Sequence, residues 1–153
     1  MTNNQISISK GNSKLGAIPS VSLPACVTCN PDAPCFSKCY ARRIEYRYKQ
    51  SRAAYAHNLT VLQADPGAYW LQVKAAAMVT RFFRYHVSGD IPNIDYFIQM
   101  VKIARDLPWV NFLAFTKQYK IVNEYIAAFG ADAIPENLKI IFSNWYRRCS
   151  SHS

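Results

Sequence analysis

Three apolar, strand-like segments alternate with two amphipathic segments in the second half of the chain, and this alternation restricts the possible folds more than any other feature. The apolar segments are residues 80–91, 109–117 and 137–145. Residues 93–107 and 118–130, which lie between them, carry apolar side chains at helical spacing. Alternating strands and helices require crossover connections, which produce a parallel sheet. The sequence therefore predicts an α/β fold built on a βαβαβ unit.

The length of the chain limits how far such a sheet can extend. A complete eight-unit TIM barrel needs about 250 residues, whereas this chain has 153. We expect three or four strands, arranged as an open sheet or as a partial TIM-like barrel. The segment 109–117 is mostly apolar, so its strand is expected to be buried on both faces of the sheet.

The first half of the chain is predicted to contain a cysteine-containing loop followed by helices. No glycine or proline interrupts residues 39–63, and Asp65-Pro66 supplies an N-cap and a first-turn proline for a second helix. We expect one domain over residues 1–153, divided in order into an irregular arm (1–24), a cysteine metal loop (25–40), two helices (40–80), the βαβαβ unit (80–146) and a tail (147–153).

The composition indicates a globular protein, because half of the residues are hydrophobic and only 18% are charged. The first sixteen residues are polar and lack the apolar core of a secretory signal. No apolar run approaches the roughly eighteen residues that a membrane-spanning helix needs. We therefore expect a cytoplasmic protein without a membrane partner.

Four of the five cysteines are crowded into fourteen positions with the spacing C-x2-C-x5-C-x3-C. Clustered thiolates in a reducing compartment bind metal more often than they form disulfides. The sequence therefore predicts a metal site formed by Cys26, Cys29, Cys35 and Cys39. The close spacing favours an iron–sulfur cluster, with structural zinc as the alternative. Whether three or four cysteines bind the metal is left open, and Cys149 is expected to be a free thiol.

Polar side chains follow each of the three predicted strands. Ligands of parallel α/β sheets bind beyond the carboxyl ends of the strands, so these side chains are candidates for a binding site. We expect His86 and Lys117 to have catalytic roles. The candidates for substrate binding are Thr116, Ser143, Asn144 and Trp145. The structural alternatives are a buried, satisfied histidine, a solvated lysine and ordinary turns.

The net charge of +9 favours an anionic partner, either a small molecule or a nucleic acid. Basic residues interleave with tyrosines just after the cysteines, in the stretch ARRIEYRYKQSR. Such mixing suits phosphate contacts and base stacking, although an exposed helix face would look the same. The candidate nucleic-acid contacts are Arg42, Arg43, Arg47, Lys49 and Arg52.

Four stretches of the sequence, taken together, resemble the phage gene-product-88 family of mobile elements. They are NSKLGAIPSVSLPACVTCNPDAPCFSKCYARR, FFRYHVSGDI, FLAFTK and LKIIFSNW, and they span residues 12–145. The resemblance implies a protein encoded by a phage or another mobile element.

The cysteine loop ending in Cys-Tyr, followed by a helix and βα units, is more loosely similar to radical S-adenosylmethionine enzymes. That resemblance implies a 4Fe–4S cluster on the loop, S-adenosylmethionine bound at Ser88, Gly89 and Asp90, and radical enzyme activity. The chain departs from the usual C-x3-C-x2-C spacing: Cys35-x3-Cys39 matches its first half, but Arg42 occupies the third cysteine position. It also has too few strands, so either a second copy completes the barrel or the chain is a shortened relative.

Three functional hypotheses follow from these features. The first is an iron–sulfur protein related to radical enzymes, acting on a small or anionic substrate that Asp90, His86 and Lys117 position electrostatically. The second is a zinc-stabilised nucleic-acid-binding protein that uses the basic, tyrosine-rich helix. The third is an interaction protein whose fold is stabilised by the metal and which has no catalytic activity.

Overall fold

The structure is a computed structural model that describes residues 4–11, 18–24 and 49–143. These residues form four α-helices, one short 3-10 helix and five strands. In chain order the elements are β1 (Ile8–Ser9), β2 (Ser20–Val21), α2 (Lys49–Ala64), α3 (Pro66–Met78), β3 (Phe82–Tyr85), α4 (Ile94–Asp106), β4 (Asn111–Thr116), α5 (Tyr119–Phe129), η2 (Ala131–Ala133) and β5 (Leu138–Phe142). The predicted α/β class and the βαβαβ order are confirmed.

The five strands form one sheet in the order β1-β2-β3-β4-β5. Strands β2 to β5 are mutually parallel, and only β1 runs antiparallel to its neighbour β2. The sheet thus has two more strands than the βαβαβ unit supplies. Both come from the segment that was expected to be an irregular arm.

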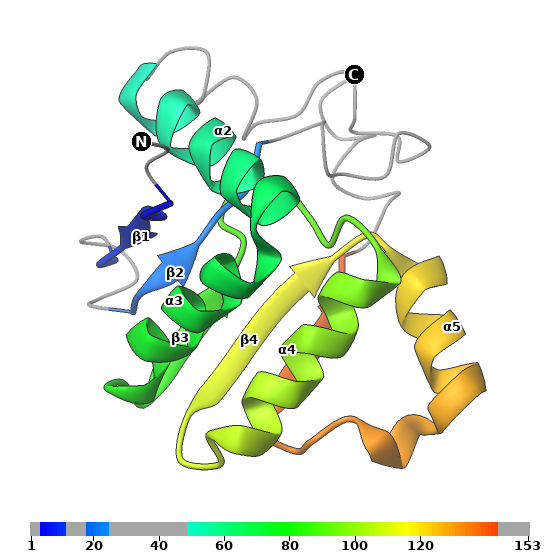
Figure 1. Cartoon of the computed structure of the whole chain (residues 1–153). Coiled ribbons are helices and arrows are strands. Elements are labelled where there is room, and N and C mark those ends of the chain that lie inside the picture. The colour runs from blue at the N-terminus through cyan, green and yellow to red at the C-terminus, as the bar shows by residue number, and fades with distance from the viewer. Residues whose placement is uncertain (1–3, 12–17, 25–48, 144–153) are drawn as a thin grey trace.

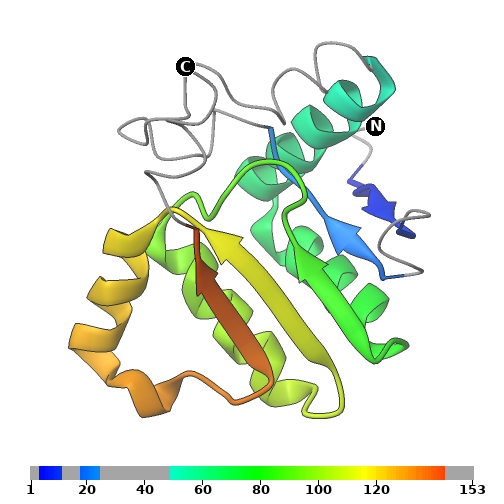
Figure 2. The same ribbon diagram turned by 180° about the vertical axis from the view of Figure 1, so that it is seen from behind.

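The helix before β3 and the helices of the βαβαβ unit lie on one side of the sheet (Figure 1). Figure 1 shows α3 and α4 in front of the strands, and Figure 2 turns the opposite face of β3, β4 and β5 toward the viewer, with no described helix in front of it. Successive parallel strands are added in one direction across the sheet, so crossovers of one hand place their helices on the same side. The layer of helices is therefore one-sided within the described part of the chain.

The burial of β4 corrects the expectation that this strand is buried on both faces. Its side chains alternate: Phe112, Ala114 and Thr116 are buried against the helices, whereas Asn111 and Phe115 are exposed on the other face. The strand is apolar because one of its faces enters the core and the other contributes apolar side chains to a half-open surface.

Two short strands replace the expected irregular arm because α2 holds them in place. The side-chain amide of Asn58 donates hydrogen bonds to the backbone carbonyls of Ser7 (3.1 Å) and Ser22 (2.9 Å). The Asn58 carbonyl oxygen accepts from the backbone N–H of Ser7 at 2.8 Å. A two-residue strand is too short to show an alternating pattern, so neither strand could be predicted from the sequence.

The helix ends follow the local chemistry of the sequence. Asp65 caps α3 by accepting from the backbone N–H of Ala68 (3.1 Å), and Pro66 occupies the first turn. Asn93 caps α4 through the backbone N–H of Tyr96, at 2.9 Å. Gly130 follows α5 with a φ of 88°, a backbone conformation that favours glycine. The expected N-terminal part of the helical region, residues 40–48, lies outside the described residues.

A large aromatic core fills the space between the helices and the sheet. Phe83, Tyr85 and Phe112 enter it from the strands and Tyr69 and Phe97 from the helices, and all five are almost completely buried. The rings of Tyr85 and Phe112, on neighbouring strands, stack with their centres 5.9 Å apart. This core anchors the strands whose carboxyl ends form the candidate site.

Candidate functional site

The carboxyl ends of the parallel strands meet at one edge of the sheet, as the upward arrowheads of β3, β4 and β5 in Figure 2 show. Backbone hydrogen bonds continue beyond the strand ends. The N–H of Leu23 donates to the carbonyl of Ser88 at 3.0 Å, and the N–H of Ser143 donates to the carbonyl of Thr116, also at 3.0 Å. The structure therefore brings together the segments that follow β2 and β3, and those that follow β4 and β5.

Asp90 is the centre of this edge. One of its carboxylate oxygens accepts from the hydroxyl of Thr116 (2.6 Å) and from the backbone N–H of Ile91 (2.7 Å), and the other accepts from the backbone N–H of Lys117 (2.9 Å). The residue is only 5% exposed. Burial raises the pKa of Asp90, and these hydrogen bonds partly oppose the rise. The carboxylate thus connects the loop after β3 to the end of β4.

The polar groups next to Asp90 also form hydrogen bonds with other groups of the chain. The Thr116 hydroxyl, besides donating to Asp90, accepts from the backbone N–H of Gln118 at 2.9 Å, just before α5 begins. Lys117 is half-buried and holds Asp90 through its backbone. The structure therefore places Asp90, Thr116 and Lys117 side by side, in a network that fixes the shape of the edge.

Ser22 is a functional candidate that sequence reasoning missed. Its side-chain oxygen accepts from the backbone N–H groups of Val87 (3.1 Å) and Ser88 (3.2 Å), and the residue is buried. It therefore shapes the loop that carries Ser88 and Gly89. Its position directly after β2 was the only available signal, and β2 itself was not expected.

His86 lies directly after β3 and is turned toward the helices. One ring nitrogen, Nε2, is 2.8 Å from the hydroxyl of Tyr96 on α4, which is in turn 2.6 Å from the hydroxyl of Tyr69 on α3. Burial lowers the pKa of His86 to about 3, and the positive charge of Arg84 contributes to the decrease. The imidazole is therefore neutral at physiological pH, and its contacts match the buried, satisfied alternative better than the catalytic one.

The backbone of His86 is strained, with a φ of 65°. This left-handed conformation is uncommon for residues other than glycine, asparagine and aspartate. The strain is retained because the buried tyrosines and the backbone hydrogen bond from His86 N–H to Val21 (2.9 Å) hold the residue on both sides.

The neutral, buried His86 predicts a loss of stability in acid. Below its ordinary pKa of 6.5 the unfolded chain binds a proton that the folded chain does not, so the free energy of unfolding falls as pH falls from 6.5 toward 3. The slope reaches about 1.4 kcal/mol per pH unit for one proton. Asparagine does not titrate and tolerates the left-handed backbone, so His86→Asn should remove this part of the slope.

Urea unfolding between pH 4 and 7 measures the effect, with His57→Gln on α2 as the matched histidine replacement. The raised pKa of Asp90 acts in the opposite direction, because its folded carboxyl takes up a proton first. The test therefore compares the pH dependence of the free energy of unfolding in the wild type with that in His86→Asn. Equal slopes for these two proteins would contradict a neutral, buried imidazole.

Several predicted site residues lie outside the described part of the chain. They are Cys26, Cys29, Cys35, Cys39, Arg42, Arg43, Arg47, Asn144 and Trp145, and Cys149, which was assigned no role, lies there too. Lys49 begins α2, and Arg52 is exposed on that helix. Among the described residues no group of three or more histidine, cysteine or acidic side chains could hold a metal ion. The prediction of a cysteine metal site is therefore neither supported nor contradicted by these residues.

Comparisons with known proteins identify one family. The model of the Gene product 88 family matches residues 1–147, nearly the whole chain. Neither the curated proteins nor the solved structures contain a match, so the looser resemblance to radical S-adenosylmethionine enzymes gains no support. Within the described residues, no helix has both the length and the apolar character needed to cross a membrane. The chain belongs to the Gene product 88 family.

Proposed function

We propose that this protein binds a 4Fe–4S cluster through Cys26, Cys29, Cys35 and Cys39 and holds it at the carboxyl edge of the parallel sheet. The observation that supports this most directly is the path of the chain. Leu23 is bonded to Ser88 at that edge, and Pro24 is the last described residue before the cysteine segment. Two peptide units, about 8 Å at most, separate Pro24 from Cys26.

The donor set fits such a cluster. Four thiolates are soft ligands that can coordinate the four irons of a cubane, one thiolate to each iron. The same four thiolates can coordinate one tetrahedral zinc ion. A cluster, when bound, supplies one-electron chemistry. The chain's own part is to provide a rigid platform, because Asp90 and Ser22 tie the loop after β3 to the neighbouring strand ends.

We propose a small anionic molecule as the substrate class. The net charge of +9 attracts anions to the whole protein, and Lys117 adds a cation at the edge itself. S-adenosylmethionine is a test ligand in this proposal. The Asp90 carboxylate, which was expected to help bind S-adenosylmethionine, already accepts three hydrogen bonds from the chain.

Anaerobic purification with iron and sulfide analysis tests the proposal. The wild type should be brown and contain iron and acid-labile sulfide, and Cys35→Ser should lose most of both. Cys149→Ser is the matched control, because it removes the one cysteine outside the cluster and should leave the metal content unchanged. If S-adenosylmethionine alters the EPR signal of the reduced cluster, one iron is free of cysteine; an unchanged signal indicates four-cysteine ligation.

Two other results would overturn the iron–sulfur proposal. Metal-free protein in which all five cysteine thiols are reactive would exclude a metal site on the cysteines. A colourless protein with one equivalent of zinc would favour the zinc-stabilised nucleic-acid-binding alternative, for which Arg52 is exposed on α2. That alternative requires an affinity for DNA or RNA that falls steeply with salt.

A further inference from the structure

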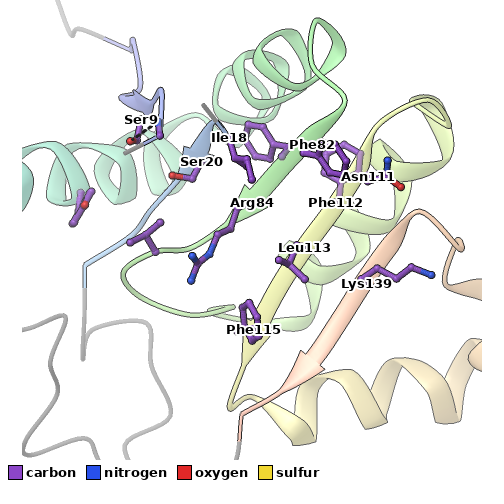
Figure 3. A pocket seen from close by; sticks show the side chains of 14 residues that line it. Ser9, Ile18, Ser20, Phe82, Arg84, Asn111, Phe112, Leu113, Phe115 and Lys139 are labelled. Atoms are coloured by element: carbon purple, nitrogen blue, oxygen red, sulfur yellow. Dashed lines mark hydrogen bonds between the residues drawn. The ribbon is translucent and has the colours of Figure 1, made fainter. Parts of the chain in front are cut away.

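The face of the sheet opposite the helices contains a pocket of about 590 Å³ (Figure 3). Its floor is apolar: Phe82, Leu113 and Phe115 project into it from β3 and β4, and Tyr55 borders it from α2. Phe82 is 55% exposed and Phe115 is 38% exposed. Large apolar side chains that remain this exposed at a concave surface commonly mark a binding site.

Arg84 lies in the middle of this apolar surface, as Figure 3 shows. Its guanidinium carbon is 5.4 Å from the centre of the Phe115 ring. Its Nε is buried and has no hydrogen-bond partner among the described residues. Burial lowers the pKa of the guanidinium, which means that its positive charge is poorly solvated. The arginine is therefore a partly desolvated cation with donor capacity to spare.

The surroundings of Arg84 add positive charge and no negative charge. Among the described residues that line the pocket there is no aspartate or glutamate. Strand pairing places Arg84 opposite Leu113, and Leu113 opposite Lys139, so the three share one row across the sheet. Neighbouring strands are about 4.8 Å apart. Lys139 thus stands about 10 Å from Arg84, backbone to backbone, on the same face.

We propose that this pocket binds a small ligand that carries an oxyanion on an aromatic or similarly flat apolar body. The oxyanion pairs with the guanidinium of Arg84, where the planar fork can form two parallel hydrogen bonds. The apolar body packs on Phe82, Leu113 and Phe115. Lys139 lies at the rim and attracts the anion from a greater distance. This inference goes beyond the metal site and requires no metal.

A pair of fluorescent probes with one shared ring system separates the charge from the apolar body. 8-Anilinonaphthalene-1-sulfonate carries a sulfonate, and N-phenyl-1-naphthylamine is the same molecule without it. We expect the full-length wild type to bind both and to bind the sulfonate more tightly. Arg84→Met should weaken sulfonate binding about tenfold or more, equivalent to at least about 1.4 kcal/mol, and should leave binding of the uncharged probe unchanged.

The matched control is Arg81→Met, which removes an exposed arginine three residues away that does not line the pocket. It should bind both probes like the wild type. Lys139→Met should weaken sulfonate binding less than Arg84→Met does. Arg84→Lys keeps the positive charge but loses the planar guanidinium, so its affinity for the sulfonate probe should lie between those of the wild type and Arg84→Met. It provides the comparison with the wild type if Arg84→Met does not fold.

Three outcomes would overturn the proposal. The first is equal affinity of the wild type and the Arg84 variants for the sulfonate probe, which is what non-specific binding to a loosened core would give. The second is a parallel loss of both probes in the Arg84 variants. The third is the absence of measurable binding of either probe to the wild type. The titration does not depend on metal content, so its failure is distinguishable from failure of the iron–sulfur proposal.

Discussion

Asp90→Ala should lower the free energy of unfolding by about 2–4 kcal/mol, because it leaves two buried donors and one half-buried donor without their acceptor. Those donors are the Thr116 hydroxyl and the backbone N–H groups of Ile91 and Lys117. Urea unfolding at pH 7 measures the loss as a lower midpoint at an unchanged m-value.

Asp90→Asn should cost less than Asp90→Ala. The amide oxygen still accepts hydrogen bonds, and a neutral side chain avoids the desolvation cost that raises the pKa of the carboxyl. One backbone N–H then faces the side-chain NH2 of the asparagine, which is also a donor, so Asp90→Asn remains less stable than the wild type. Asp132→Ala, at an exposed position in η2, should change stability by less than about 0.5 kcal/mol. A loss under 1 kcal/mol in Asp90→Ala would contradict the central role of this carboxylate at the edge.

The second large effect is expected at Asn58, the completely buried residue that connects α2 to β1 and β2. Asn58→Ala should lower the free energy of unfolding by about 2–4 kcal/mol, since the carbonyls of Ser7 and Ser22 lose their donor. Asn58→Asp should cost more, because it also places a carboxylate against two carbonyl oxygens in a dry site.

The order of the two Asn58 variants is the critical result. Asn58→Ala improves helix propensity, so any loss it shows comes from the broken tertiary contacts. Asn123→Ala, on the exposed side of α5, provides the matched asparagine replacement and should leave stability within about 0.5 kcal/mol of the wild type. If Asn58→Asp unfolds at the wild-type midpoint, Asn58 does not hold the N-terminal strands.

Local features of the fold were predictable because their chemistry acts over a few residues. Asp65, Asn93 and Gly130 stand at helix ends where a side-chain acceptor or a free φ angle is needed. The βα alternation was predictable for a related reason, since the period of apolar residues reports the local backbone conformation directly. β1 and β2 were missed because they exist through Asn58, which follows Ser7 by 51 positions.

The candidate site was predictable in outline but not in its internal contacts. Parallel strands end at a common edge, so the proximity of Asp90, Thr116 and Lys117 followed from topology alone. The roles of these three residues did not follow from topology. The sequence could not reveal that the Asp90 carboxylate is occupied by donors of the chain, or that His86 turns into the aromatic core to meet Tyr96. Both facts depend on side-chain directions that packing sets.

By itself the sequence determined the fold class, the order of the strands and helices within the βαβαβ unit, and the edge at which polar groups gather, because periodicity and capping are local properties of the chain. Only the tertiary structure decided that one face of the sheet remains uncovered by a described helix. The apolar strand of residues 111–116 has the same composition whether one face or both are covered. The tertiary structure also decided that the Nε of Arg84 lies in the resulting pocket without a hydrogen-bond partner among the described residues, because pairing depends on which distant groups reach the guanidinium after the sheet has formed.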